Sequence, residues 1–298
     1  MSPVPREGAW VGAMPIVFVL IWSTGFIVAR YGMPHAPPFS FLSVRYALSI
    51  LCFLPWIWLA KVRWPAGRQQ WFHLTVSGVL MHAGYLGGVW AAVKAGMGSG
   101  LSALIVGLQP VLTAIWLSST GGHVSRRQWQ GLSLGFAGLA LVVSRKFGQG
   151  SPSDHVDLVN LSLVVGALLS ITVGTLYQKR HVAACDVRSA NVVQLGAALC
   201  ATLPLALMEA EPMRWGTELA AAMAWSVLAL TLGGSSLLYL LIQRGAATAV
   251  TSLLYMVPPC TAVMAWLMFD EPITATTLLG TALTAIGVSL VVRPARSP

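Results

Sequence analysis

A few polar and aromatic side chains lie inside long apolar stretches of this sequence. Polar groups in hydrocarbon are costly and tend to face a bundle interior or a water-filled cavity. His82 and Tyr85 share one helical face, and Ser235 and Tyr239 are one turn apart. Such a mixture of rings and hydrogen-bonding groups suits an amphipathic, partly aromatic metabolite. The candidate substrate-binding residues are Trp22, Arg45, His82, Tyr85, Gln109, Ser235, Tyr239 and Tyr255.

Each candidate also has a structural interpretation. His82 could be a packing histidine with satisfied hydrogen bonds, and the tyrosines could join neighbouring helices. Gln109 precedes Pro110, so its amide could satisfy a carbonyl that the proline frees. Arg45 could extend to the membrane surface, or its guanidinium could bind the carboxylate of an amino-acid-like substrate.

Catalytic and metal-binding patterns do not account for these residues. The chain contains no H-E-x-x-H, G-x-S-x-G, P-loop or dinucleotide-binding glycine pattern. The four cysteines form no C-x-x-C pair, so they are interpreted as small apolar packing residues. We therefore expect no enzyme, cofactor or metal. A channel, an intramembrane enzyme and a structural membrane protein stay open as alternatives, although a channel should have a continuous polar stripe.

The composition excludes a water-soluble protein. Of 298 residues, 56% are hydrophobic and 9% are charged, against about 25% charged in a soluble domain. A membrane crossing needs about 20 apolar residues. Ten such spans are predicted, at 10–29, 39–60, 72–93, 100–117, 129–144, 157–178, 189–208, 219–242, 246–268 and 274–292.

The net charge of +9 is interpreted as a topology signal. Lys and Arg stand singly or in pairs in the short gaps between spans, which does not favour nucleic-acid binding. Twelve of them fall on the side of the N-terminus and five on the other side. The positive-inside rule then predicts that both termini are cytoplasmic. The expected location is a bacterial inner membrane.

The sequence is also partly a duplication. With a shift of 149 residues, 131–143 lies over 280–292 with six of 13 positions identical and no gap. Five spans are an odd number, so tandem copies must have opposite orientations, as in many secondary carriers. The predicted units are a five-helix repeat at 1–147, a linker at 148–156 and a second repeat at 157–298.

The same shift pairs Pro110 with Pro259. A proline within a helix removes a backbone hydrogen bond and bends the axis. We predict that the two prolines are hinges for alternating access; the alternative is a pair of static kinks.

The order of several motifs resembles the drug/metabolite transporter superfamily, in particular its EamA-type exporters. The motifs are Trp22, Gly25 and Arg30 in the first span, Pro37-Pro38-Phe39 with Arg45, Gln109-Pro110, Pro258-Pro259, and Glu271-Pro272. The first half departs from the pattern, because 120–125 has no Glu-Pro. The resemblance implies an all-α integral membrane fold with ten transmembrane helices in two inverted five-helix repeats.

These observations predict a secondary transporter that exports small metabolites, with amino acids, including aromatic ones, as leading substrates. Import is the alternative direction. Facilitated transport is favoured because no Asp or Glu lies in the middle of a span, with proton coupling through His82 as the second choice. The expected partners are a small-molecule substrate and the lipid bilayer, not nucleic acid. A complete two-half fold is consistent with a monomer and leaves a dimer open.

Overall fold

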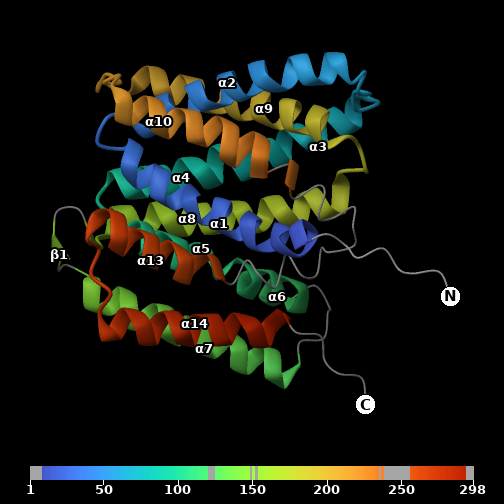
Figure 1. Cartoon of the computed structure of the whole chain (residues 1–298). Helices are drawn as coiled ribbons and strands as arrows, with labels where there is room; N and C mark the ends of the chain where they lie inside the picture. Colours follow the sequence, from blue (N-terminus) through green and yellow to red (C-terminus); the bar gives the residue numbers. More distant parts are fainter. Residues whose placement is uncertain are drawn as a thin grey trace.

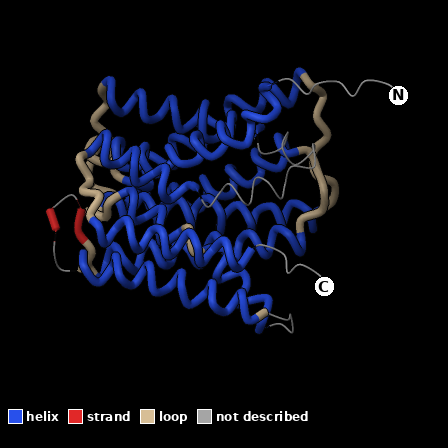
Figure 2. Tube along the Cα trace, turned by 60° about the horizontal axis from the view of Figure 1, so that its bottom comes forward, coloured by secondary structure: helices blue, strands red, loops and turns tan. Residues whose placement is uncertain are grey.

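The structure is a computed structural model that describes residues 9–119, 125–147, 150–151, 154–234, 236–237 and 256–292. The chain is predominantly helical, as predicted, and its helices lie side by side in one bundle (Figure 1). Helix α1 begins, and α14 ends, at the end of the bundle opposite the short strands β1 and β2 (Figures 1 and 2). We call the end with the strands the hairpin end.

The first half of the chain forms long helices at the predicted spans. They are α1 (Ala9–Gly32), α2 (Pro38–Leu59), α3 (Arg68–Gly78), the π-helix η1 (Val79–Gly84), α4 (Tyr85–Lys94), α5 (Ser99–Val106), α6 (Gln109–Ser119) and α7 (Arg126–Lys146). Segments α3, η1 and α4 follow one another without a gap, as one helical stretch from Arg68 to Lys94.

The second half begins with a small hairpin inside the predicted linker. Strands β1 (Gly150–Ser151) and β2 (Asp154–His155) pair antiparallel. The helices that follow are α8 (Leu158–His181), α9 (Val187–Met208), α10 (Thr217–Trp225), the π-helix η2 (Ser226–Gly233), α13 (Val257–Phe269) and α14 (Ala275–Val292). Parts of the predicted spans 219–242 and 246–268 lie outside the described residues, so the count of ten stays a prediction.

Five of the described helical stretches have the length and composition to cross a membrane by themselves. They are Pro38–Leu59, Arg68–Lys94, Ser99–Trp116, Leu158–His181 and Val187–Met208. The stretches 16–32, 217–233, 257–269 and 275–290 are apolar but shorter. Together they make the chain a multi-pass membrane protein.

Side-chain caps fix several helix starts where the chain enters the bundle. The Ser125 side chain accepts from the Gln128 backbone amide, and the Gln128 side-chain oxygen accepts from the Ser125 backbone amide. Asp157 and Asn160 form the same reciprocal pair at the start of α8. Each pair satisfies two amides that a helix start leaves without partners.

Glycines bring α7 and α14 into close antiparallel contact at one edge of the bundle (Figure 1). A Cβ at Gly138 would lie 2.5 Å from the Gly280 carbonyl oxygen. A Cβ at Gly287 would lie 2.5 Å from the Gly131 carbonyl oxygen. Gly131 corresponds to Gly280, and Gly138 to Gly287, under the shift of 149. The two contacts are therefore reciprocal, as in packing about a local two-fold axis.

Other close helix pairs also join the two halves of the chain. Helices α2 and α9 pack together at the opposite edge, and α4 packs on α8 (Figure 1). Gly84 and Gly88 face Ser170 and Ala167 of α8 with no room for a Cβ. These two glycines, four residues apart, thus serve close helix packing.

Candidate substrate-binding site

Two π-helical segments lie at equivalent positions in the two halves. Under the shift of 149, His82 of η1 corresponds to Thr231 of η2. π-helical turns are rare in proteins, but those that occur are often at functional sites. They turn side chains and carbonyls out of the regular helical phase. The individual residues give no sign of these segments, and the sequence analysis does not predict them.

Arg45 lies in the bundle interior beside η2. Its side chain is 7% exposed, so it does not extend to the membrane surface. The Arg45 Nε and Nη2 atoms donate to Thr231 Oγ1 at 3.3 and 3.2 Å. Thr231 uses its own proton to donate to the Ser226 carbonyl at 2.9 Å. The hydroxyl orientation is thus fixed so that its lone pairs face the guanidinium.

No described carboxylate pairs with Arg45. The ion pairs among the described residues involve Glu218, Glu211, Asp154, Asp157 and Asp186, all in loops, in strand β2 or at helix ends. Burial of a cation is costly unless an anion or several hydrogen bonds compensate it. The Thr231 hydroxyl supplies only a neutral partner, so the guanidinium retains capacity for an anion.

Two tyrosines and His82 surround this guanidinium. The Tyr46 hydroxyl donates to the His82 carbonyl at 2.9 Å, and the two rings meet edge to face at 6.1 Å. The side chains of Tyr46 and Tyr85 lie near the Arg45 guanidinium. The structure therefore brings together three of the predicted residues, Arg45, His82 and Tyr85.

Two buried hydroxyls near this cluster have no partner among the described residues. They are Ser49 Oγ, one turn after Arg45 on α2, and Ser226 Oγ, in η2. Both side chains are 0% exposed. Buried polar groups are nearly always hydrogen-bonded, so each exception needs an explanation. A polar ligand that enters between α2 and η2 would supply the missing partners.

The shift of 149 also relates Arg45 to Gln194 of α9. Arg45 contacts Thr231, while the Gln194 side chain interacts with His82. The contact between Arg45 and Thr231 therefore has an equivalent in the contact between Gln194 and His82. The first contact contains a cation, and the second contains a neutral amide in its place. Gln194 Nε2 also donates to Ser77 Oγ at 2.9 Å and Gln178 Oε1 at 3.0 Å. Gln194 and Thr231 are not among the residues predicted from the sequence, although the shift of 149 relates them to Arg45 and His82.

Two other predicted site residues, Trp22 and Gln109, contact different partners. Trp22 packs against Phe18, with ring centroids 5.4 Å apart. Gln109 Nε2 donates to Thr175 Oγ1 at 3.0 Å, so its amide does not cap a freed carbonyl. Ser235, Tyr239 and Tyr255 lie outside the described residues.

The two predicted hinge prolines begin helices in the structure. Pro110 is the second residue of α6, after a break at Gly107 and Leu108. Pro259 lies in the first turn of α13. A proline in a first helical turn costs no internal hydrogen bond. Both prolines therefore lie at helix starts. Pro110 follows the break between α5 and α6, and Pro259 lies close to Met256, the first described residue before α13.

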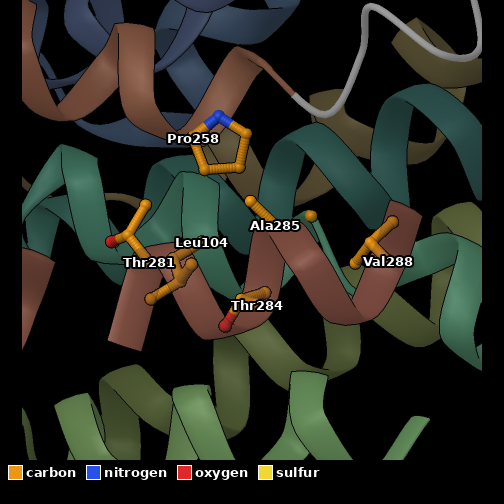
Figure 3. Close-up of a pocket in the computed structure, with 7 residues that line it drawn as sticks. Leu104, Pro258, Thr281, Thr284, Ala285 and Val288 are labelled. Carbon is orange, nitrogen blue, oxygen red and sulfur yellow. The ribbon is translucent and has the colours of Figure 1, made fainter. Parts of the chain in front are cut away.

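Gly107 at the first break packs against Pro258, with 2.9 Å between a built Cβ and Pro258 Cγ. A cavity of about 20 Å³ lies beside this contact, between α5, α13 and α14. Figure 3 shows its lining, with Pro258 on one side and Thr281, Thr284, Ala285 and Val288 of α14 across from it. This volume holds about one water, so the cavity is not a metabolite site.

Carboxylates from the second half cap two helix starts of the first half at the hairpin end. Glu271 accepts from Ser99 N at 2.9 Å, Ser99 Oγ at 2.8 Å and Gly100 N at 3.2 Å. Glu209 accepts from Phe39 N and Ser40 N at 2.9 and 2.8 Å. Anions are favourable at helix N-termini. These contacts join the halves at one end of the bundle.

Comparison with known proteins gives matches over most of the chain. The model of the EamA-like transporter family matches residues 10–144 and again 159–293, two ranges that begin and end 149 residues apart. An uncharacterized transporter of Archaeoglobus fulgidus is 26% identical over 91% of this chain and 93% of its own length. A probable amino-acid metabolite efflux pump of Salmonella typhimurium is 23% identical over 57% of this chain and 53% of its own length. A solved crystal structure superposes with a TM-score of 0.64 at 17% identity, over 93% of this chain and 95% of the other.

Proposed function

The chain belongs to the EamA-like transporter family, and on this premise we propose that it is a secondary transporter for small metabolites that carry a carboxylate, amino acids above all. Its family and its relatives are transporters. The observation that carries the choice of substrate class is the buried Arg45 guanidinium, which has only the Thr231 hydroxyl as a described hydrogen-bond partner.

Reciprocal packing supports an inverted repeat of two five-helix units. Equivalent residues of α7 and α14 meet in antiparallel pairs, as expected when two copies are related by a two-fold axis in the membrane plane. The two family matches, separated by 149 residues, support the same duplication. In this proposal the ten-helix carrier exposes its site to the two sides in turn, because either half can adopt the conformation of the other.

The cluster around Arg45 supplies what a carboxylate-bearing metabolite needs. A guanidinium offers a planar pair of donors that fits a carboxylate, and the unpartnered hydroxyls of Ser49 and Ser226 lie in adjoining segments. Tyr46, Tyr85 and the His82 ring provide an apolar and aromatic environment. Gln194 and His82 would face the part of the substrate away from its carboxylate.

Export is the proposed direction, with import as the alternative. The support is the printed name of two relatives, probable amino-acid metabolite efflux pumps, which the chain matches over about half of their length. Facilitated transport is proposed because the described helix interiors contain no Asp or Glu. Proton coupling through His82 is the alternative. We place the carrier in a bacterial inner membrane as a monomer with cytoplasmic termini.

The test is transport of matched substrate pairs into proteoliposomes. Radiolabelled aromatic amino acids and their carboxamides differ only in the carboxylate. We expect Arg45→Gln to reduce transport of the acids by at least tenfold, since hydrogen bonds to charged groups are worth about 1.5–3 kcal/mol. Transport of the amides should change by less than twofold. Arg145→Gln, at an exposed arginine near the end of α7, is the control.

Equal losses for acids and amides would contradict recognition of the carboxylate by Arg45. The same vesicles with an imposed pH gradient separate the two forms of energy coupling. A gradient that does not change the final accumulation supports facilitated transport. Accumulation that follows the gradient and is lost in His82→Gln would support proton coupling instead.

A further inference from the structure

The end of the bundle opposite the hairpin has a polar pocket next to an apolar groove on the same surface. The polar pocket, about 580 Å³, lies between the loop at 60–66 and the loop at 183–188. The apolar groove, about 750 Å³, runs along the last turns of α2 and is lined by residues such as Leu54, Ile57 and Trp58. The two hollows adjoin, because Lys61, Val62 and Trp64 line both.

We propose that this composite pocket binds one anionic phospholipid, with its phosphate headgroup between the two loops and an acyl chain along α2. A ligand for this surface needs a compact polar end beside a long apolar end. Among membrane components, a phospholipid has this shape. The proposal is independent of the substrate and of the direction of transport.

The charge of the polar pocket specifies an anionic headgroup. Lys61, Arg63, Arg188 and Asp186 line it. Asp186 is neutralised by Arg188, because Arg188 Nε and Nη2 donate to its two oxygens at 3.0 and 2.7 Å. Lys61 and Arg63 are exposed and form no ion pair with any described residue. The pocket therefore has two uncompensated positive charges for a phosphate.

Hydrogen bonds between the two loops preform the polar pocket. Gln70 Nε2 donates to the Ala183 carbonyl at 2.8 Å, and the Ala183 amide donates back to Gln70 Oε1 at 3.1 Å. Ser189 Oγ donates to the Arg63 carbonyl at 3.1 Å. Lys61 has a positive φ of 48°, which turns the chain sharply at the end of α2. A pocket with fixed walls loses little conformational entropy when a ligand binds.

Tryptophans place this pocket at the level of lipid headgroups. Trp64 and Trp71 stack with ring centroids 6.0 Å apart, and the Trp71 indole donates to the Pro65 carbonyl at 2.9 Å. Trp56 lies under the Arg188 guanidinium at 5.4 Å. Tryptophan is enriched at the membrane–water interface, where one end of the ring is apolar and the other is wet. Basic pockets between transmembrane helices at this depth suit anionic headgroups.

The test is native mass spectrometry of the full-length, delipidated protein during titration with phosphatidylglycerol. Phosphatidylcholine with identical acyl chains tests the charge requirement. We expect a saturable first phosphatidylglycerol site that phosphatidylcholine does not fill. The Lys61→Gln, Arg63→Gln double variant should weaken this site about 25-fold, at roughly fivefold for each cation near a membrane surface. Lys179→Gln with Arg180→Gln, two exposed cations at the end of α8, is the matched control and should change the affinity less than twofold.

Several results would overturn the proposal. If the site variant and the control variant weaken phosphatidylglycerol binding equally, the effect comes from general surface charge and not from this pocket. Inorganic phosphate or glycerol phosphate that competes at the same concentration as the lipid would indicate a soluble anion site. A phosphatidylcholine affinity equal to that of phosphatidylglycerol would remove the charge argument. Thermal unfolding of each variant in detergent separates a lost site from a lost fold.

Discussion

The Thr284 hydroxyl donates to the Gly135 carbonyl at 3.4 Å, and these two residues occupy equivalent positions 149 residues apart in the duplicated sequence. Contact between a residue and its own counterpart occurs where a local two-fold axis passes between them. Here the axis runs between α7 and α14. The two reciprocal glycine contacts between α7 and α14 lie on either side of this bond.

A substitution at this seam should therefore destabilise the protein. Gly287→Ala puts a methyl group 2.5 Å from the Gly131 carbonyl oxygen and 2.5 Å from the Gly135 amide nitrogen. Overpacking of this kind costs about 1–3 kcal/mol. We expect a lower melting temperature in detergent and less monodisperse protein on size exclusion. Gly196→Ala in α9 is the control, because nothing lies within 4 Å of its built Cβ. Equal melting temperatures for the two variants would contradict the close contact of α7 and α14.

Removal of the Arg45 charge should separate stability from transport. Arg45→Met keeps a long side chain but removes a buried cation that no described carboxylate compensates. Because the unpaired charge costs desolvation energy, we expect an unchanged or higher melting temperature. Transport of carboxylate substrates should fall at least tenfold. A clear loss of thermal stability would instead indicate that Arg45 is structural.

The Glu271 carboxylate should stabilise the closed arrangement of the hairpin end. Glu271→Gln removes the charge that accepts from Ser99 and Gly100 at the start of α5. Loss of such a cap costs about 1 kcal/mol and favours separation of the halves at this end. We expect faster labelling of a cysteine placed at Ser99 by a membrane-impermeant maleimide. Asp270→Asn is the control, because the carboxylate of Asp270, next to Glu271 in the sequence, is exposed. Identical labelling rates in the two backgrounds would contradict a role for the cap in closure.

The paired helix starts at Pro110 and Pro259 should matter more for flux than for folding. Replacement of both by Ala removes the backbone restriction that proline imposes at each helix start, and at Pro110 it permits a continuous helix across Gly107 and Leu108, so bending there becomes harder. We expect a severalfold loss of transport with less loss of folded yield. Pro55 and Pro204 are a second pair related by the shift, inside α2 and α9, and their double Ala variant is the control. Loss of yield in proportion to flux would exclude a hinge.

Asp186 should give the protein a measurable acid sensitivity. Hydrogen bonds from the Arg188 side chain lower the pKa of this carboxyl below its ordinary value of 3.8. A lowered pKa means that the stabilisation is complete above pH 3.8 and is lost as the pH falls through the folded-state pKa. The melting temperature of the wild type should exceed that of Asp186→Asn at pH 6, and the difference should shrink toward pH 3. A difference that is constant with pH would contradict the ionic interaction.

Much of the fold could be predicted from the sequence because its signals are local. Apolar length predicts each helix, and the described helices α2, α8 and α9 fall on predicted spans within a few residues. Only part of the candidate site could be predicted from the sequence. Arg45, His82 and Tyr85 stand out because polar groups are rare within spans, and they do lie together. Trp22 and Gln109 stand out for the same reason but contact other partners.

Sequence by itself determined that this chain is a multi-pass helical membrane protein, because hydrophobicity and helical length are properties of contiguous residues. It also determined the internal shift of 149, since identity between two segments needs no coordinates. Tertiary structure decided that Arg45 meets Thr231, that π-helical turns interrupt two equivalent helices, and that Glu271 caps α5. The contacts of Arg45 and of Glu271 join residues more than 100 positions apart. They depend on how helix faces pack and rotate against one another, which no local pattern encodes.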